Sequence, residues 1–84
     1  QMADEVNLSS YHFSRMFKAS MGVSPSRYLL QLRLDKAKSL LLQIPPQPIS
    51  AIAQQTGFTD QAYLTRQFRQ RFGITPARFR DQYI

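Results

Sequence analysis

The fold of this chain is decided by SRMFKASMGVSPSRY, at residues 14–28, and TRQFRQRFGITPARF, at residues 65–79. The two stretches align at a spacing of fifty-one residues, and five of fifteen paired positions are identical, where average residue frequencies predict roughly one. The identical pairs are Arg15/Arg66, Phe17/Phe68, Gly22/Gly73, Pro25/Pro76 and Arg27/Arg78. An internal duplication in a small basic chain suggests duplicated recognition of a repetitive partner.

Length and composition limit the classes of protein to consider. The 84 residues suffice for one small domain with a limited core. Eleven Lys and Arg against five Asp and Glu give a formal net charge of +6, which favours a polyanionic partner. The absence of cysteine excludes a disulfide scaffold and a thiolate metal site, and agrees with a reducing cytoplasm. Without a long apolar run or a signal-peptide pattern, we expect a soluble protein with no membrane partner.

Each copy contains a helix stop followed at once by a helix start, at residues 22–25 and 73–76. A glycine there can take the left-handed backbone of a helix C-cap. The Ser or Thr two positions later can accept an amide hydrogen bond, and proline suits the first helical turn. Two helices are therefore predicted to end, and two to begin, at matched places.

The segment 25–43 is the longest predicted helix, and its leucines occupy more than one face. Such a helix suits a linker packed between two units. The prolines within residues 44–48 must end it. Because no stretch shows sustained alternation, the sequence predicts an all-α fold without strands.

The repeat continues upstream at a spacing of fifty and pairs Ala3 with Ala53, Asn7 with Gly57 and Leu8 with Phe58. In each copy this pattern predicts a helix, a tight turn and a second helix, the second capped by Ser9 in copy one and by Thr59 or Asp60 in copy two. The two helix-turn-helix units are predicted at residues 1–24 and 48–74, with a C-terminal helix at 75–84. Ser50 is the expected cap of the first helix in copy two. Its counterpart would precede Gln1, so we expect the chain to be a fragment of a longer protein.

A rotation of 100° per residue separates the faces of the second helix in each unit. One face carries aromatic and aliphatic residues that we expect in the core, among them Phe13, Phe17, Leu64, Phe68, Phe72 and Phe79. The opposite faces carry Ser10, Tyr11, Ser14, Arg15 and Lys18, and Gln61, Ala62, Thr65, Arg66 and Arg69. Arg suits guanine, Gln suits adenine, and Thr or Ala suits the thymine methyl, whereas Lys18 and Arg69 suit phosphates.

Other interpretations stay open for these polar faces. A single such face is most simply a solvated surface, but its recurrence in both copies favours recognition. Arg27 and Arg78 stand at helix starts, where a cation opposes the helix dipole, so each suggests an anion nearby: a phosphate or a carboxylate such as Asp81. Two rival functions remain. The chain could be a module that binds an acidic protein, or it could bind nucleoid DNA or RNA without sequence specificity. An enzyme is disfavoured, because one His and five scattered acidic residues make no acid/base pair or metal cluster.

GFTDQAYLTRQFRQRFGITPARFR, at residues 57–80, closely resembles the signature of the AraC/XylS family of bacterial transcription regulators. PISAIAQQ at 48–55 and LSSYHFSRMFKASMGVSPSRYL at 8–29 are also similar to that family. The resemblance implies an all-helical, homeodomain-like fold, in which a long linker helix joins two helix-turn-helix subdomains. The additional N-terminal helix that usually begins the family's domain is missing here.

The resemblance further implies sequence-specific binding of double-stranded DNA through adjacent major-groove segments of an asymmetric site. Carried over by position, the base-reading residues are Tyr11, Ser14, Arg15, Gln61, Ala62, Thr65 and Arg66, and the phosphate contacts are Ser10, Lys18, Arg27, Arg69 and Arg78. No cofactor or metal is implied. RNA polymerase and an N-terminal effector or dimerisation domain are the further partners to expect, in the bacterial cytoplasm at the nucleoid. The residues do not distinguish an activator from a repressor.

Overall fold

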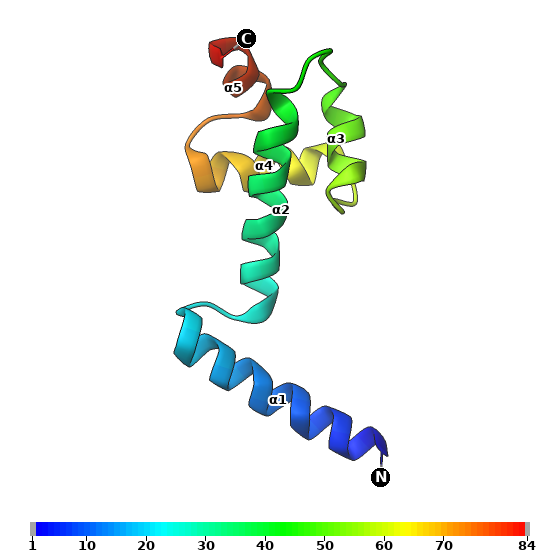
Figure 1. The fold of residues 1–84 in the computed structure, drawn as a ribbon, viewed down its shortest axis with the longest axis vertical. Helices are drawn as coiled ribbons and strands as arrows, with labels where there is room; N and C mark the ends of the chain where they lie inside the picture. The colour runs from blue at the N-terminus through cyan, green and yellow to red at the C-terminus, as the bar shows by residue number, and fades with distance from the viewer. Residues whose placement is uncertain (1, 84) are drawn as a thin grey trace. The chain divides into compact units, whose positions relative to one another are not determined.

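The computed structural model describes the backbone of residues 2–83 and the side chains of residues 11–83. Within this part of the chain five helices follow one another and no strand is present, which confirms the predicted all-α class. The helices are α1 Met2–Met21, α2 Pro25–Leu41, α3 Ile49–Gln55, α4 Gln61–Phe72 and α5 Pro76–Tyr83 (Figure 1). They form two compact units, Gln1–Gln31 and Leu32–Ile84, and α2 contributes to both.

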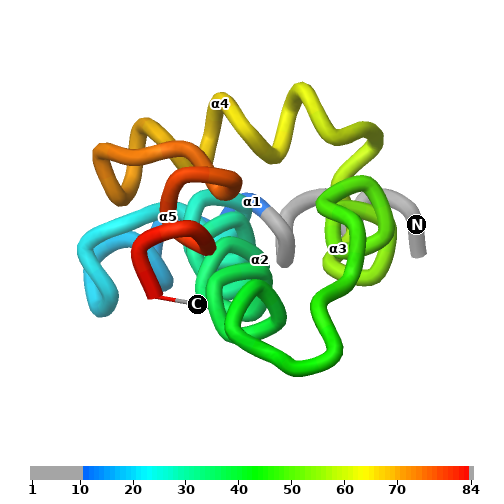
Figure 2. The backbone as a smooth tube through the Cα atoms, turned by 90° about the horizontal axis from the view of Figure 1, so that it is seen from above, coloured from blue at the N-terminus to red at the C-terminus, as the bar shows by residue number. Residues whose placement is uncertain are grey.

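The second unit contains most of the buried apolar residues. In both views of the backbone, α3, α4 and α5 gather around the C-terminal part of α2 (Figures 1 and 2). The core side chains are Leu34, Ala37, Leu40 and Leu41 of α2, Ile52 and Ala53 of α3, Phe58, Leu64 and Phe68 of α4 and its preceding turn, and Phe79 of α5. Phe68 is fully buried, with its ring centroid 4.6 Å from that of Phe72 and 5.8 Å from that of Phe79. Two of these rings, Phe68 and Phe79, occupy positions that are also aromatic in copy one, and they lie in the core of this unit.

The repeated helix stop and start take the predicted local geometry in both copies. Gly22 and Gly73 have φ of 82° and 76°, and each amide donates to the carbonyl four residues earlier at 2.8 Å. Ser24 Oγ and Thr75 Oγ1 each accept an amide hydrogen bond from the residue three positions on, at 3.3 Å. Identical local chemistry thus ends α1 and α4 and begins α2 and α5.

The ends of α2 and α3 differ from the expected positions. α2 ends at Leu41 rather than residue 43, because the next two amides donate to carbonyls three residues earlier, as in a tightened last turn. Ser50 is not the cap of α3. The helix begins at Ile49 after Pro48, whose carbonyl accepts hydrogen bonds from the amides of Ala51 and Ile52, so Ser50 lies inside the first turn.

The first unit departs from the prediction for residues 1–24. The sequence predicted a turn at Asn7 and a cap at Ser9, but α1 continues through both, so one 20-residue helix replaces the expected helix-turn-helix. The physical reason lies in the residue type: every residue with positive φ in the described chain is a glycine, and an asparagine bears a steric cost in that conformation. Gly57, the counterpart of Asn7, adopts φ of 87° without that cost.

The core prediction for the first unit is correspondingly only partly realised. Phe17 is half-buried and packs against Tyr28 at 5.3 Å between ring centroids. Phe13 remains 57% exposed and Met16 67% exposed, although both lie on the face that was predicted to be internal. The first turns of the chain are part of the continuous helix α1, so they do not fold back over this face.

Candidate nucleic-acid interface

Helix α4 presents one polar face and buries the opposite one. Leu64 and Phe68 are fully buried and fix the helix to the core. Of the residues predicted to read bases, Gln61, Ala62 and Arg66 are exposed, and Thr65 is half-buried. The four therefore share the outward side of α4, although their role in reading bases stays a prediction.

The start of α4 is capped by Asp60, one of the two residues, Thr59 and Asp60, that the sequence predicted as alternative caps. Its backbone is extended, with φ of −156° and ψ of 171°, and its Oδ1 accepts a hydrogen bond from the Tyr63 amide at 2.7 Å. The side chain satisfies an amide that the helix itself leaves free. Gln61 and Ala62 are consequently held in the first turn, at the end of the helix that recognition helices present to base edges.

The turn between α3 and α4 depends on two residues that sequence reasoning missed. Thr56 is buried, and its hydroxyl donates to the Ile52 carbonyl at 2.7 Å, which closes the end of α3. Arg33 of α2 lies against Gly57, with its Nε 3.0 Å from the place that a Cβ would occupy. The sequence signal for Thr56 is its place just before the turn: the equivalent residue of copy one, Val6, has no hydroxyl.

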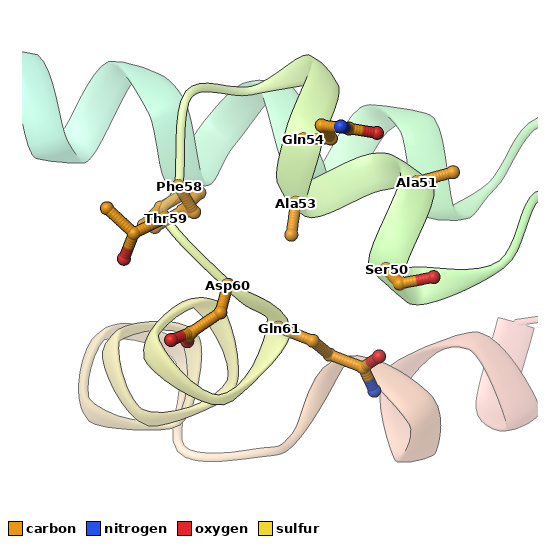
Figure 3. A pocket seen from close by; sticks show the side chains of 8 residues that line it. All are labelled: Ser50, Ala51, Ala53, Gln54, Phe58, Thr59, Asp60 and Gln61. Carbon is orange, nitrogen blue, oxygen red and sulfur yellow. The ribbon is translucent and has the colours of Figure 1, made fainter.

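A hollow of about 420 Å³ lies in the angle of this helix-turn-helix, as Figure 3 shows. It is lined by Ser50, Ala51, Ala53, Gln54, Phe58, Thr59, Asp60 and Gln61. Its hydroxyl and amide groups come from the first helix of the motif and from the start of the second. In DNA-bound motifs of this kind the first helix crosses the sugar-phosphate backbone, and polar side chains contact phosphates there. Ser50 and Gln54 are thus further polar groups beside the predicted interface.

Two arginines predicted to contact phosphates line one pocket. Arg69, near the end of α4, and Arg78, in the first turn of α5, border a space of about 260 Å³ together with Gly73, Ile74 and Thr75. Both arginines are exposed. Arg78 does not pair with Asp81: among the described side chains the ion pair is between Arg71 and Asp35, at 3.4 Å. The phosphate contact expected for Arg78 stays a prediction.

In the first unit the predicted outward residues also lie at the surface. Tyr11, Ser14, Arg15 and Lys18 are exposed on α1, and Arg27 is exposed in the first turn of α2. Arg15 Nη1 donates to the Tyr11 hydroxyl at 3.1 Å. The side chain of Ser10 lies outside the described residues. The exposed basic and hydroxyl groups of α1 are of the same chemical kinds as those of α4.

Metal-ligand clusters and membrane-spanning helices can be assessed within the described residues. Among residues whose side chains are described, no group of three His, Cys, Asp or Glu side chains could hold a metal ion. Within residues 2–83, no helix combines the length and the apolar character that crossing a membrane requires.

Known proteins are similar to this chain over nearly all of its length. Residues 2–82 match a family model described as a helix-turn-helix domain. The chain is 38% identical over 72 residues to the probable transcriptional regulator LumQ of Photobacterium leiognathi, an alignment that covers 86% of this chain and 29% of LumQ. It is also 38% identical over 85 residues to the HTH-type transcriptional activator RhaR of Pectobacterium carotovorum, where the alignment covers 95% of this chain and 30% of RhaR.

The fold has a solved counterpart in a transcriptional regulator from Chromobacterium violaceum, described as a protein with an AraC-type DNA-binding domain. The TM-score is 0.80 at 36% identity, and the match covers 87% of this chain and 64% of that one. The chain spans less than a third of the length of the two curated relatives.

Proposed function

Because this chain belongs to the AraC-type helix-turn-helix family of bacterial transcription regulators, we propose that it reads an asymmetric site on double-stranded DNA through two recognition helices. The chain is a DNA-binding domain of that family and not an enzyme. The observation that carries the finer proposal is the polar outward face of α4, fixed by a buried core on one side and by the Asp60 cap at its start.

The proposed reading residues occupy the outward faces of α1 and α4. They are Tyr11, Ser14, Arg15, Gln61, Ala62, Thr65 and Arg66. Arginine can donate two parallel hydrogen bonds to guanine, and glutamine can pair in the same way with adenine. Because the two sets differ in sequence, each helix would prefer a different run of bases, and one chain would read a site without internal symmetry.

The proposed phosphate contacts are Ser10, Lys18, Arg27, Arg69 and Arg78. Arg69 and Arg78 supply the strongest support, because both border one pocket beside the start of α5 and neither forms an ion pair with a carboxylate among the side chains of residues 11–83. Contacts of this kind fix the register of a protein on DNA without reading sequence.

The length of α2 supports the use of two neighbouring groove segments. Its 17 residues extend about 26 Å at the rise of an α-helix, somewhat less than the ~34 Å of one turn of DNA. Recognition helices at the two ends of such a linker would suit successive major-groove segments.

In a longer parent protein, this chain would serve as the output module. The alignments cover less than a third of these relatives, and one of them is described as a transcriptional activator. We therefore propose an N-terminal effector or dimerisation domain, a contact with RNA polymerase at the promoter, and a location in the bacterial cytoplasm at the nucleoid.

The direct test is a selection of binding sites from random DNA duplexes, performed with the wild-type chain and with Arg66→Ala. We expect Arg66→Ala to lose about 1–3 kcal/mol on the selected site and to relax the preference at one position, as expected for a bidentate arginine. The matched control is Arg71→Ala, which removes the same charge from α4 at a residue that is paired with Asp35.

Unchanged base preferences in Arg66→Ala would refute the reading assignment. Wild-type binding that ignored DNA sequence yet persisted at high salt would instead favour a module for an acidic protein partner.

A further inference from the structure

Each of the two proposed base-reading arginines lies against a tyrosine of its own helix. The Arg66 Cζ is 5.7 Å from the centroid of the Tyr63 ring on α4. The Arg15 Cζ is 5.4 Å from the centroid of the Tyr11 ring on α1, and Arg15 also donates to the Tyr11 hydroxyl at 3.1 Å. Both distances lie within the range of a cation–π interaction.

These two contacts are not copies of one another. Arg15 and Arg66 are equivalent in the repeat, but Tyr63 is equivalent to His12, and Tyr11 is equivalent to Ala62. The ring lies three residues before the arginine in one helix and four residues before it in the other. Because different positions provide the same kind of contact, the pairing is not a by-product of the shared scaffold.

Tyr63 is itself held in place by the turn that precedes α4. Its amide donates to Asp60 Oδ1 at 2.7 Å, and its ring packs against that of Phe58 at 5.6 Å between centroids. Phe58 is buried in the core, and Tyr63 is half-buried beside it. A ring that is restrained at its backbone and at its side chain provides a fixed support for Arg66.

Such a support is useful for reading a base. A free arginine side chain has many rotamers, and ordering it on a base edge costs conformational entropy. A guanidinium that lies over an aromatic face keeps its N–H donors at its planar edges, where they can still pair with guanine. A tyrosine that limits the rotamers of arginine before binding therefore raises the preference for the paired base.

We infer that Tyr63 is a positioning residue for Arg66: Tyr63 sets base preference by orienting the arginine and does not touch the DNA itself. The inference rests on the proposed function. Tyr11 holds Arg15 in a parallel way, in addition to the base contact proposed for it. The chemical partner of both arginines is a guanine edge in the major groove.

The test measures the base preference at the position that Arg66→Ala relaxes. Tyr63→Met retains a long apolar side chain to pack on Phe58 but provides no ring face, whereas Tyr63→Phe retains the ring. We expect Tyr63→Met to lower the preference about twofold to fivefold, the size of an exposed cation–π contact, and Tyr63→Phe to stay near wild type. The salt dependence of binding should not change, because no charge is removed.

The decisive comparison repeats Tyr63→Met in the Arg66→Ala background, where we expect no further change in base preference. Tyr83→Leu is the matched control, because it removes an exposed tyrosine that packs on Phe79 in the same unit. Melting temperatures identify any variant that is partly unfolded, and Tyr63→Leu replaces Tyr63→Met if the latter does not fold.

The outcomes separate the inference from the proposed function. If Arg66→Ala relaxes a base preference and neither ring-free variant does, the inference fails alone. If the effect of Tyr63→Met persists without Arg66, Tyr63 acts by another route and the inference is overturned. If Arg66→Ala itself changes no preference, the proposed reading of bases fails, and the inference fails with it.

Discussion

The cap at the start of α4 allows a quantitative test of how the recognition helix is fixed. In Asp60→Ala the Tyr63 amide loses its acceptor, which lies at 2.7 Å in the structure. Replacing an N-cap aspartate by alanine costs about 0.5–2 kcal/mol, and the lost interaction of its charge with the helix dipole adds about 0.3–1 kcal/mol at an exposed site. Because Asp60 is exposed and the two effects overlap, we expect a loss of about 1–2 kcal/mol in the free energy of unfolding.

The assay is urea and thermal unfolding of the whole chain, followed by circular dichroism. For a domain of this size, each kcal/mol lowers the melting temperature by about 4–8 °C, so Asp60→Ala should melt about 4–16 °C below wild type. Asp60→Asn keeps a cap acceptor and loses only the charge, so it should retain most of the stability. Asp81→Ala, at an exposed residue on α5, should change the stability by no more than about 0.5 kcal/mol.

Two results would refute this reasoning. If Asp60→Ala were no less stable than Asp81→Ala, the hydrogen bond to Tyr63 would not stabilise the helix start. If Asp60→Asn were as unstable as Asp60→Ala, the charge rather than the cap geometry would be the source of the effect.

Three further predictions address the core, a helix end and the DNA contacts. Phe68→Ala should cost about 3–5 kcal/mol, because its ring is fully buried, whereas Phe13→Ala, at a residue 57% exposed, should cost far less; equal losses in urea unfolding would contradict the burial pattern. Gly73→Ala should cost about 1–2 kcal/mol through its φ of 76° alone, since a Cβ there would meet no neighbour within 4 Å, and a stability equal to wild type would show that the backbone relaxes freely. Lys18→Ala and Arg69→Ala should each lower the slope of log affinity against log salt by about 0.9 if each residue neutralises one phosphate, and an unchanged slope in a salt titration would remove that residue from the interface.

Local chemistry explains which parts of the fold could be predicted from sequence. The helix ends at Gly22 and Gly73 were predictable because a glycine with φ near 80° needs no tertiary partner to be favourable. The outward face of α4 was predictable because helical periodicity separates Arg66 from the buried Phe68 without knowledge of the neighbouring helices.

The failures arise where a local pattern requires tertiary support. The pairing of Asn7 with Gly57 predicted a turn in both copies, but the turn in copy two also depends on the Thr56 hydroxyl, the buried Phe58 and the nearby Arg33. Arg33 approaches Gly57 from another helix, and no periodicity in the sequence could indicate that approach. The contacts of Arg66 with Tyr63 likewise depend on side-chain conformations rather than on spacing alone.

The duplication distinguishes a shared scaffold from most of the residues proposed to read DNA, although the proposed reading arginines Arg15 and Arg66 are the same in both copies. Pairs with the same residue type in both copies, such as Gly22 with Gly73, have the same backbone geometry. Several of the proposed reading pairs differ, such as Ser14 with Thr65, and lie on the outward faces, where a substitution removes little buried surface. Exchanging outward residues between copies should therefore alter base preference with little loss of stability. An exchange that left the preference intact would indicate that the reading residues lie elsewhere, because the shared scaffold cannot distinguish two different half-sites.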